Sequence, residues 1–330
     1  MQALRVLTYN VRYFGHALKG LASTRPAMRR IAEAIANLEP LPAIVCLQEV
    51  ETRSLRSTVA HGGDETQLEQ FMQVLTNALE ASGRSDRYQA YYFPAHAYRL
   101  SRRTQVYTTG LAILAHTDLV VDHHNADSPH DITERALHPI RGLKQTRICA
   151  HARLHLRRGG VVEPIDVFNT HLSLPSTLAR AFWTERRRLG WGPNQVQEAR
   201  NLARFVERER ASDRFLVLGD FNALPGSPVY KFLVEDQRWI DAFAQRYSMS
   251  LEELVMWPTA GFMRMRMHLD HIFAGPALRW LDFDGSYAFG DRSAPFHGLS
   301  DHVPMVARCR IARGSSLPPG PRGARARSVG

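Results

Sequence analysis

Carboxylate, amide and imidazole side chains stand at the ends of several apolar runs in this sequence. Asp220 and Asn222 follow one such run, and Asp301 and His302 precede another far along the chain. Groups of this kind are costly to bury in a folded core unless they bind a metal or transfer protons. Two such clusters therefore predict one polar site that is assembled from distant parts of the chain.

Four further residues recur at the same kind of position. Asn10, Glu49, His171 and Asp270 each lie at the end or lip of a predicted strand. A single Asp after a glycine is usually a turn residue, and a lone His on a strand is usually structural. The recurrence of the whole set, more than any one residue, predicts an active site.

The chain resembles the endonuclease/exonuclease/phosphatase superfamily, also called deoxyribonuclease I-like, in a series of short motifs. These motifs occur in the family's order and span roughly residues 3–311; they are residues 7–11, 47–49, 110–114, 169–172, 219–223, 269–273 and 300–304. The resemblance implies a four-layer α/β/β/α sandwich, in which two mostly antiparallel sheets pack face to face with helices outside. It also implies hydrolysis of phosphate esters.

Hydrolysis of a phosphate ester needs a metal that polarises the phosphoryl oxygen, an activated water and stabilisation of the leaving oxygen. Hard oxygen ligands suit Mg²⁺ or Mn²⁺. We expect Glu49 to be the first ligand and Asp301 to contribute a second. By resemblance, Asn10 lies beside both the metal and the phosphate, and Arg147 matches a phosphate-contacting arginine.

His302 is the expected general base, because imidazole titrates near neutral pH. By resemblance, Asp270 orients its ring and stabilises the protonated form. Asp220 and Asn222 are expected to hold the attacking water and the phosphate, and Asp220 also has a proton-transfer role in the family. His171 is expected to bind a phosphoryl oxygen or to assist the leaving group.

Two departures from the family's pattern bear on the substrate. Apurinic endonucleases of the family usually have Lys two residues after the metal-binding Glu, whereas this chain has Glu51. They also favour Tyr where this chain has His271. Both differences point away from a dedicated DNA-repair role and toward a more general endonuclease or phosphodiesterase.

Length and composition fit one domain over residues 1–312. The chain has 330 residues, of which 44% are hydrophobic and 22% charged, as in ordinary globular proteins. It has neither an apolar run of about 18 residues nor the features of a signal peptide, so we expect a cytoplasmic monomer. Three cysteines without close spacing predict reduced core thiols rather than disulfides or a thiolate zinc site.

Basic residues outnumber acidic ones, and the net charge is +10. Residues 313–330 carry four arginines and no acid, so removing them leaves +6 on residues 1–312. A basic surface attracts a phosphate-bearing substrate, but it does not distinguish nucleic acids, anionic lipids and phosphorylated metabolites. Residues 313–330 are rich in Pro, Gly, Ser and Arg, which predicts a disordered tail.

The spacing of apolar residues predicts the order of helices and strands. Helices are predicted at residues 24–38, 67–79, 194–210 and 227–234, and strands at residues 88–93, 111–115 and 119–123. Residues 148–156 and 161–168 are predicted to form a hairpin. Helices separated by many strands favour two packed sheets covered by helices.

Two segments are predicted to be loops beside the site. Residues 172–193 hold Trp183, Trp191 and three consecutive arginines. These side chains could stack a base, dock on a lipid surface or simply pack on the body of the domain. Residues 122–138 contain four histidines, which fit either a metal site or a solvated loop.

Three classes of function remain open. The first is a divalent-metal-dependent hydrolase of phosphodiester bonds that resembles the nucleases of the family. The second is a lipid phosphodiesterase similar to neutral sphingomyelinases, with residues 172–193 as the membrane contact. The third is a non-catalytic binding module, which the presence of Glu49, Asp220 and His302 argues against. No obligate protein partner is evident in any of the three.

Overall fold

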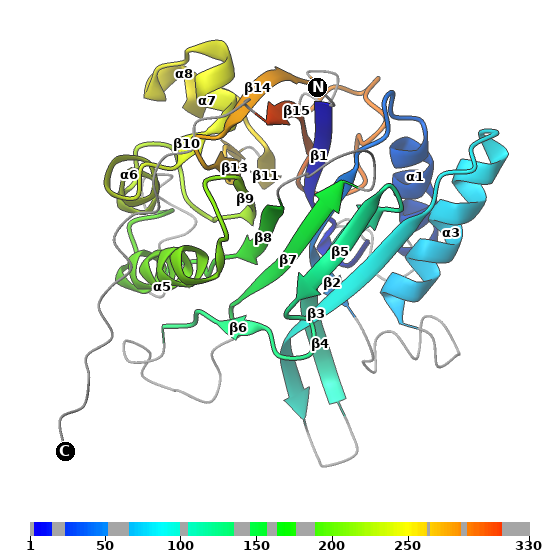
Figure 1. Ribbon diagram of the computed structural model, residues 1–330, viewed down its shortest axis with the longest axis horizontal. Coiled ribbons are helices and arrows are strands. Elements are labelled where there is room, and N and C mark those ends of the chain that lie inside the picture. The colour runs from blue at the N-terminus through cyan, green and yellow to red at the C-terminus, as the bar shows by residue number, and fades with distance from the viewer. Residues whose placement is uncertain are drawn as a thin grey trace.

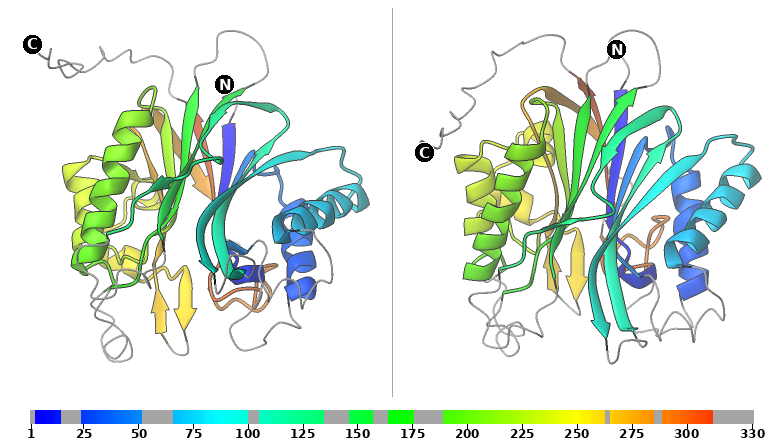
Figure 2. Two further views of the ribbon diagram at one scale, coloured as in Figure 1. Left: turned by 90° about the horizontal axis from the view of Figure 1, so that it is seen from below. Right: turned by 60° about the horizontal axis from the view of Figure 1, so that its bottom comes forward.

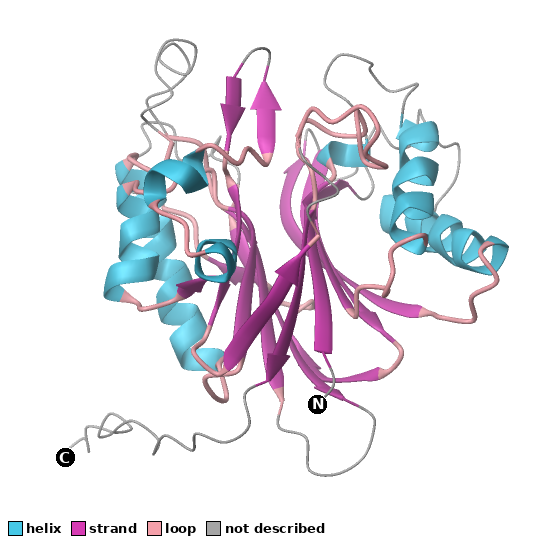
Figure 3. Ribbon diagram, turned by 90° about the horizontal axis from the view of Figure 1, so that it is seen from above, coloured by secondary structure: helices cyan, strands magenta, loops and turns pink. Residues whose placement is uncertain are grey.

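Two β-sheets packed face to face form the centre of this computed structural model, and helices cover their outer faces (Figure 1, Figure 3). The structure describes residues 3–14, 24–51, 66–99, 105–134, 146–156, 164–175, 189–262, 265–284 and 289–311. The predicted four-layer α/β/β/α sandwich is therefore confirmed. The predicted disordered tail, residues 313–330, lies outside the described residues.

The first sheet has the strand order β14-β15-β1-β2-β4-β3. Its strands are β1 (Ala3–Asn10), β2 (Ile44–Glu51), β3 (Tyr88–Arg99), β4 (Gln105–His116), β14 (Leu278–Phe283) and β15 (Met305–Ile311). Strands β1 and β2 pair in parallel, and the other neighbours pair antiparallel. The parallel pair thus lies at the middle of the sheet.

The second sheet has the order β10-β13-β9-β8-β7-β5, and β6 pairs with β7 beside this path. Its strands are β5 (Leu119–His124), β6 (His130–Asp131), β7 (Ile148–Leu156), β8 (Ile165–His171), β9 (Phe215–Asp220), β10 (Ile240–Asp241) and β13 (Asp270–Ala274). Strands β8 and β9 are parallel, and the other pairs are antiparallel. The two sheets therefore share one pattern, a central parallel pair with antiparallel flanks.

Helices cover each sheet on the side away from its partner, as Figure 2 shows for α1 and α3 on one side and α5 on the other. The helices are α1 (Thr24–Ala36), α3 (Gln67–Ala81), α5 (Pro193–Glu209), α6 (Pro228–Lys231), α7 (Ala242–Tyr247) and α8 (Leu251–Val255), and a π-helical turn (Phe232–Asp236) continues α6. No helix in the described ranges is long and apolar enough to cross a membrane.

The observed elements differ from the predicted ones mainly at their ends. Helix α1 ends at Ala36 rather than at residue 38, and the predicted helix 227–234 divides into α6 and the π-helical turn. Strands β3 and β4 are longer than predicted because they pair with each other along almost their whole length. Strand β8 ends at His171, three residues later than predicted, and residues 157–163 lie outside the described ranges.

Apolar side chains form three main layers of core. Alternate residues of β7 (Ile148, Ala150, Ala152 and Leu154) face the other sheet, as predicted from their spacing. A second cluster joins the first sheet to α1 and α3, and a third joins the second sheet to α5 and α6. The three cysteines are free and buried, which confirms that they are core thiols.

A buried amide pair links the two sheets in the interior. Gln48 Nε2 on β2 donates to Asn169 Oδ1 on β8 at 2.8 Å, and Asn169 Nδ2 donates to the carbonyl oxygens of Leu47 and Ala112 at 3.0 Å each. Both amides are fully buried, so losing any of these partners would leave a polar group unpaired at a considerable cost. The pair therefore fixes the register of one sheet against the other.

The carboxyl ends of both parallel pairs meet at one edge of the sandwich. Asn10 at the end of β1 lies opposite Gln48, which immediately precedes Glu49, and His171 at the end of β8 lies opposite Asp220 at the end of β9. Because β13 runs antiparallel to β9, it begins at the same edge, where Asp270 pairs with Asp220. The sheet topology thus gathers the polar ends that the sequence singled out.

A small hairpin projects beyond this edge (Figure 2). It consists of β11 (Ala260–Phe262) and β12 (Met265–Met267). Ala260 forms a bridge with His302, and the backbone N–H of Gly261 donates to the carbonyl oxygen of Asp301 at 2.8 Å. The hairpin is thereby attached to the segment that carries the last motif.

Candidate active site

A cleft of about 390 Å³ opens where the strand ends meet. Its polar wall consists of Arg12, Tyr13, Glu49, Arg147, His171, Asp220, Asn222, Asp301 and His302. Its apolar wall consists of Leu174, Ala260, Gly261, Met267 and Leu269, most of them from the hairpin and the residues that follow it. Asn10 and Asp270 adjoin the cleft through hydrogen bonds to Asp220 and His302, respectively. The structure therefore brings together all nine residues predicted for the site.

His302 lies between two carboxylates. Its Nδ1 is 2.8 Å from Asp270 Oδ2, and its Nε2 is 3.7 Å from Asp220 Oδ2. Burial alone would lower the pKa of the ring, but the negative charges of Asp270, Asp220 and Glu49 and the hydrogen bond to Asp270 outweigh it and raise the pKa to about 9. The predicted orientation of His302 by Asp270 is thus present in the geometry.

Asp270 is held from its backbone side by Thr259. The hydroxyl oxygen of Thr259 accepts hydrogen bonds from the N–H groups of Leu269 and Asp270, both at 3.0 Å. These bonds give Thr259 a structural role beside Asp270. The other carboxylate oxygen of Asp270, Oδ1, is buried and has no hydrogen-bond partner among the described residues.

Asp220 is buried at the centre of the site and is bound from two sides. Its Oδ1 accepts the backbone N–H of Asn222 at 2.9 Å, and its Oδ2 accepts Nδ2 of Asn10 at 3.0 Å. Burial raises the pKa of this carboxyl to about 6, with a further contribution from Asp270, although the charge of His302 and these hydrogen bonds oppose the rise. Asp220 can therefore exchange a proton near neutral pH.

Asn10 joins the two sheets at the cleft. Its Nδ2 donates to Glu49 Oε1 at 3.2 Å as well as to Asp220, and its Oδ1 accepts the backbone N–H of Arg12 at 3.0 Å. The side chain thus presents its amide nitrogen, rather than its oxygen, to the two carboxylates. This orientation favours the predicted phosphate-binding role of Asn10 over its predicted role as a metal ligand.

His171 is neutral in this environment. Burial, together with the positive charges of Arg147 and His302, holds its pKa well below the usual value. Asn222 Nδ2 lies 3.2 Å from His171 Nε2 and also donates to the carbonyl oxygen of Leu172 at 2.9 Å. A neutral ring whose Nε2 accepts from Asn222 carries its hydrogen on Nδ1, so it can bind an oxygen but is a poor acid at pH 7.

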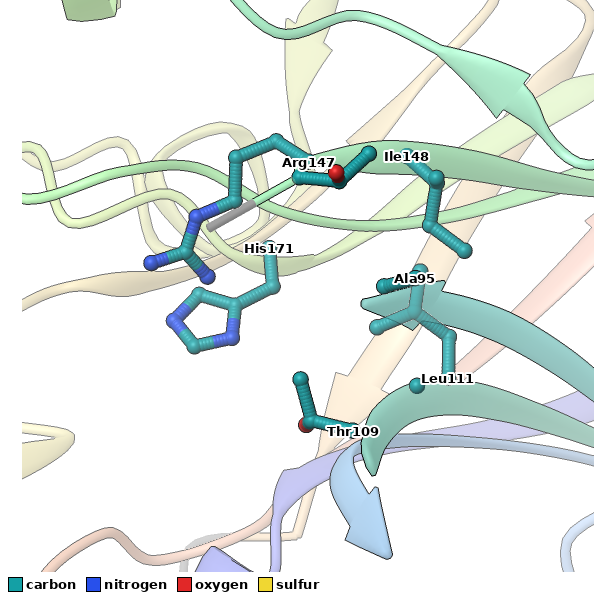
Figure 4. A pocket seen from close by; sticks show the side chains of 8 residues that line it. Ala95, Thr109, Leu111, Arg147, Ile148 and His171 are labelled. Carbon is teal, nitrogen blue, oxygen red and sulfur yellow. The ribbon is translucent and has the colours of Figure 1, made fainter. Parts of the chain in front are cut away.

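Arg147 enters the site from the start of β7, on the side of His171. Figure 4 shows the two side chains next to each other, with Thr109 across a small hollow from them. Arg147 Nε donates to Ser173 Oγ at 3.3 Å, and Ser173 is in turn held by the carboxylate of Glu198. The guanidinium therefore lies beside His171 at the cleft, and its phosphate-binding role stays a prediction.

Asp301 forms an ion pair with Arg12. The sequence predicted Asp301 as a metal ligand and gave no role to Arg12, although Arg12 directly follows the first motif, residues 7–11. A basic residue so near that motif was the available signal. The hairpin β11–β12, which supplies much of the apolar wall, carried no such signal because the residues it contributes to the cleft, Ala260, Gly261 and Met267, are ordinary apolar and small ones.

Only parts of the two predicted loops lie within the described residues. Residues 176–188, including Trp183 and the three arginines, lie outside the described ranges. Trp191 is 44% exposed and does not line the cleft, whereas Leu174 does. In residues 122–134, the part of the histidine-rich segment that the structure describes, no cluster of metal-binding side chains is present.

Two sets of side chains could hold a divalent cation. One atom from each of Asp220, Asp270 and His302 lies within 4.8 Å of the other two. However, His302 is protonated at its raised pKa and already engages Asp270, so it is a poor ligand in this state. Glu49, an oxygen donor at the cleft surface, suits a hard cation better. Oδ1 of Asp270, which is buried and has no hydrogen-bond partner among the described residues, is a further oxygen donor beside His302.

Solved structures share this fold at low sequence identity. The human nocturnin catalytic domain with bound sulfate anion matches with a TM-score of 0.61 and 19% identity, over 94% of each chain. ANGEL2, a 2′,3′-cyclic phosphatase in complex with adenosine-2′,3′-vanadate, matches with 0.58 and 16%, over 94% of this chain and 96% of that one. A mannosyl-6-phosphatase of Bacteroides thetaiotaomicron matches with 0.53 and 17%, over 93% and 100%.

Sequence comparison is more specific. No curated protein matches this sequence. The endonuclease/exonuclease/phosphatase family, in contrast, matches residues 7–302, a span that begins just before Asn10 and ends at His302. The chain therefore belongs to the endonuclease/exonuclease/phosphatase family, whose members are phosphoesterase hydrolases.

Proposed function

We propose that this chain is a divalent-metal-dependent phosphodiesterase in which a water molecule attacks phosphorus and His302 is the general base. One observation carries the proposal. His302 is held at Nδ1 by Asp270 while its Nε2 faces the cleft beside Asp220. A base needs an oriented ring with one nitrogen open to the substrate, and this arrangement supplies both.

The other polar residues divide into two roles. Asp220 and Asn222 hold the attacking water and a phosphoryl oxygen, and the carboxyl of Asp220, whose pKa is raised to about 6, can also exchange a proton. Asn10 and Arg147 bind the phosphate from opposite sides of the cleft, and neutral His171 binds a phosphoryl oxygen or the leaving oxygen. Each role uses a group that lines the cleft or adjoins it.

Glu49 and Asp301 would hold the cation, either Mg²⁺ or Mn²⁺. When bound, such an ion polarises the phosphoryl oxygen and neutralises charge in the transition state. The pKa of His302 is consistent with this arrangement. Its rise to about 9 depends partly on the negative charge of Glu49, so offsetting that charge lets the ring lose its proton at lower pH.

The shape and charge of the cleft support a diester substrate of the nuclease type. Arg12 and Arg147 give the lining its basic groups, and Leu174, Met267 and Leu269 give it apolar ones. A phosphate flanked by less polar groups matches this division. The net charge of +10 adds a long-range attraction to polyanions.

The test is hydrolysis of a substrate panel by the full chain, first with Mg²⁺ or Mn²⁺ and then with EDTA. The panel holds supercoiled plasmid, single-stranded DNA, RNA, inositol phosphates and bis-p-nitrophenyl phosphate, and the control is the His302→Ala variant. We expect metal-dependent cleavage of at least one diester that the variant does not perform. Hydrolysis of monoesters alone would replace the diesterase with a phosphatase, and no turnover at all would favour a binding module.

Exposed apolar side chains near the cleft support one second candidate, a lipid phosphodiesterase. Leu174 is 46% exposed at the cleft wall, and Trp191 lies beyond it at the other end of residues 176–188. Such side chains can insert into a membrane interface. Co-sedimentation with sphingomyelin vesicles, followed by assay of lipid hydrolysis, tests this candidate; a protein that stays in the supernatant and leaves the lipid intact excludes it.

A further inference from the structure

The turn that follows β1 has an unusual backbone. Arg12, Tyr13 and Phe14 have φ angles of 43°, 58° and 52°, so three consecutive residues other than glycine lie in the left-handed region. Glu49 and Asn222, with φ of 56° and 47°, do the same at the cleft. Strained backbone persists where the surrounding structure over-determines it, and it gathers at functional sites. The strained backbone of residues 12–14 therefore indicates a functional role for this turn.

Contacts on both sides fix this turn. The backbone N–H of Arg12 donates to Asn10 Oδ1 at 3.0 Å, and Gln67 Nε2 donates to the carbonyl oxygen of Tyr13 at 3.3 Å. The ring of Phe14 is buried and stacks on Phe71, with their centroids 4.9 Å apart. The consequence is that Arg12 lines the cleft from a rigid backbone.

The partner of Arg12 is equally well placed. Asp301 lies between Ser300 and His302, and Ser300 Oγ donates to the carbonyl oxygen of Asn10 at 2.8 Å. The first and last motifs are thus tied together where the Arg12–Asp301 ion pair forms. Neither side chain is deeply buried, because the guanidinium is 32% and the carboxylate 16% exposed. An ion pair at such a surface is weak enough for another anion to displace.

Arg12 and Asp301 suit ligands of opposite charge in the proposed reaction. Arg12 suits the phosphate, and Asp301 suits the divalent cation. A guanidinium binds a tetrahedral oxyanion such as a phosphate through paired N–H groups, and a carboxylate binds a hard cation. While the two side chains bind each other, neither is fully available to its ligand. Capture of an anion by Arg12 would leave the Asp301 carboxylate without its counter-charge.

We propose that Arg12 is a phosphate-binding residue that Asp301 holds until substrate arrives. A phosphate that takes the guanidinium releases the Asp301 carboxylate for the divalent cation, so anion and cation bind with positive coupling. The inference rests on the proposed function, because it assumes a cation at Glu49 and Asp301. It adds Arg12 to the proposed phosphate site. It also gives the site an order of assembly, in which phosphate binding releases Asp301 for the cation.

Titration calorimetry of Mn²⁺ into the metal-free full chain tests the coupling, with sulfate as the dianion and chloride to match ionic strength. We expect sulfate to tighten Mn²⁺ binding by about fivefold or more, and Mn²⁺ to tighten sulfate binding by the same factor. In Arg12→Ala, Mn²⁺ should bind more tightly than in the wild type when sulfate is absent, and sulfate should no longer change its affinity.

Arg147→Ala is the matched control, because it removes the same charge from the other side of the cleft. It should weaken sulfate binding while the coupling to Mn²⁺ remains. A double-mutant cycle then isolates the pair: in an Asp301→Asn background, Arg12→Ala should leave Mn²⁺ affinity unchanged. Arg12→Lys, which keeps the charge but loses the paired N–H geometry, should retain part of the coupling.

Two results would overturn the inference. One is an equal gain of Mn²⁺ affinity in Arg12→Ala and Arg147→Ala, which would show only a general effect of charge. The other is sulfate coupling that survives in Arg12→Ala with an unchanged melting temperature. Neither measurement requires turnover. Coupling without activity on any substrate would therefore refute the proposed function alone, and activity without coupling would refute this inference alone.

Discussion

Two neighbouring residues of β13 each take part in a histidine–carboxylate pair, and the two pairs differ in their surroundings. Asp270 pairs with His302 at 2.8 Å, and His271 pairs with Asp241 at 3.3 Å. Successive side chains of a strand point to opposite faces, so the first pair lies at the cleft and the second lies under the helices. Each pair consists of one histidine and one aspartate, so residue types alone do not distinguish the pair at the cleft from the pair under the helices.

The difference is in the second ring nitrogen. His271 Nε2 lies 2.9 Å from the carbonyl oxygen of Ala223, so both of its nitrogens have protein partners. Its ring stacks on Phe273 and meets Phe221 edge-on. His302 binds Asp270 through Nδ1 only and presents Nε2 to the cleft. An open nitrogen thus distinguishes the proposed catalytic pair at the cleft from the core pair, whose two ring nitrogens both have partners.

Removing each imidazole in turn tests this comparison with the largest expected effect. His302→Ala should lower kcat by about 10³-fold or more while the melting temperature changes little, because it removes the open nitrogen. His271→Ala should leave the kcat of the folded protein near the wild-type value. It should instead reduce the free energy of unfolding by about 3 kcal/mol, because it leaves a cavity and removes the imidazole partner of the buried Asp241 carboxylate, which keeps only its cap to the N–H of Ala244 and its contact with Tyr230.

Steady-state rates measured with thermal unfolding curves distinguish the two outcomes. The protein concentration is corrected for the folded fraction, so that lost stability is not read as lost turnover. The comparison fails if His302→Ala retains turnover, or if His271→Ala loses turnover while fully folded.

The carboxylates give the second test. Asp220→Asn should lower kcat by about 10²-fold or more, because an amide cannot take up a proton. It should also lower the pKa of His302, since the charge of Asp220 is one cause of its rise. Asp241→Asn should keep kcat within about threefold and lose about 1–3 kcal/mol of stability. Activity assays and NMR titration of the imidazole protons measure both effects, and an unchanged His302 titration in Asp220→Asn would contradict the assignment.

A substitution at Glu49, which lines the cleft, tests whether the site binds a cation there. Glu49→Gln should raise the Mg²⁺ concentration for half-maximal rate by about 10-fold or more, because an amide is a weaker ligand than a carboxylate. The KM for substrate at saturating Mg²⁺ should change much less. Glu253→Gln on α8, a capping residue outside the cleft, is the control and should leave the metal titration unchanged. Identical titrations in both variants would remove Glu49 as a ligand.

The sequence predicted the sandwich and the membership of the site because both depend on short-range signals. Apolar runs that end in Asn10, Glu49, His171 and Asp220 become parallel strands, and parallel strands place their carboxyl ends at one edge. The strand β13 and its pairing with β9 then add Asp270. Each of these positions could be recognised without knowing any long-range contact.

The remaining features depend on contacts that have no local signature. Nothing in the sequence around Asp301 indicates that it pairs with Arg12. The pair forms only in the folded chain, where the first and last motifs come together. The apolar wall from β11 and β12 was missed for the same reason. The segment 227–234 was predicted as one helix because a π-helical turn has the same apolar spacing over so short a length.

The pH dependence of stability is the smallest expected effect and separates the two pairs by its direction. Burial opposes the rise of the His302 pKa to about 9, but the neighbouring carboxylates outweigh it. The folded protein therefore binds a proton that the unfolded chain loses near pH 6.5, so this stabilisation is complete below pH 6.5 and is lost as pH rises to about 9. Asp241 behaves in the opposite way: burial favours a higher pKa, but the hydrogen bond and charge of His271 lower it. Its contribution is present above about pH 3.8 and is lost as pH falls below that value.

Melting temperatures of the metal-free protein in EDTA, measured across pH, should thus decline on two separate limbs. His302→Gln should flatten the limb between pH 6.5 and 9 and leave the acid limb unchanged, whereas Asp241→Asn should flatten the acid limb only. Cysteine ionisation in the unfolded chain adds to the decline above about pH 9, so the first window is the informative one. If His302→Gln declines between pH 6.5 and 9 as steeply as the wild type, the ring does not carry the proton in the folded state. His302 would then already be a free base without a cation at Glu49, and the electrostatic difference between the two pairs would disappear while their geometric difference remained.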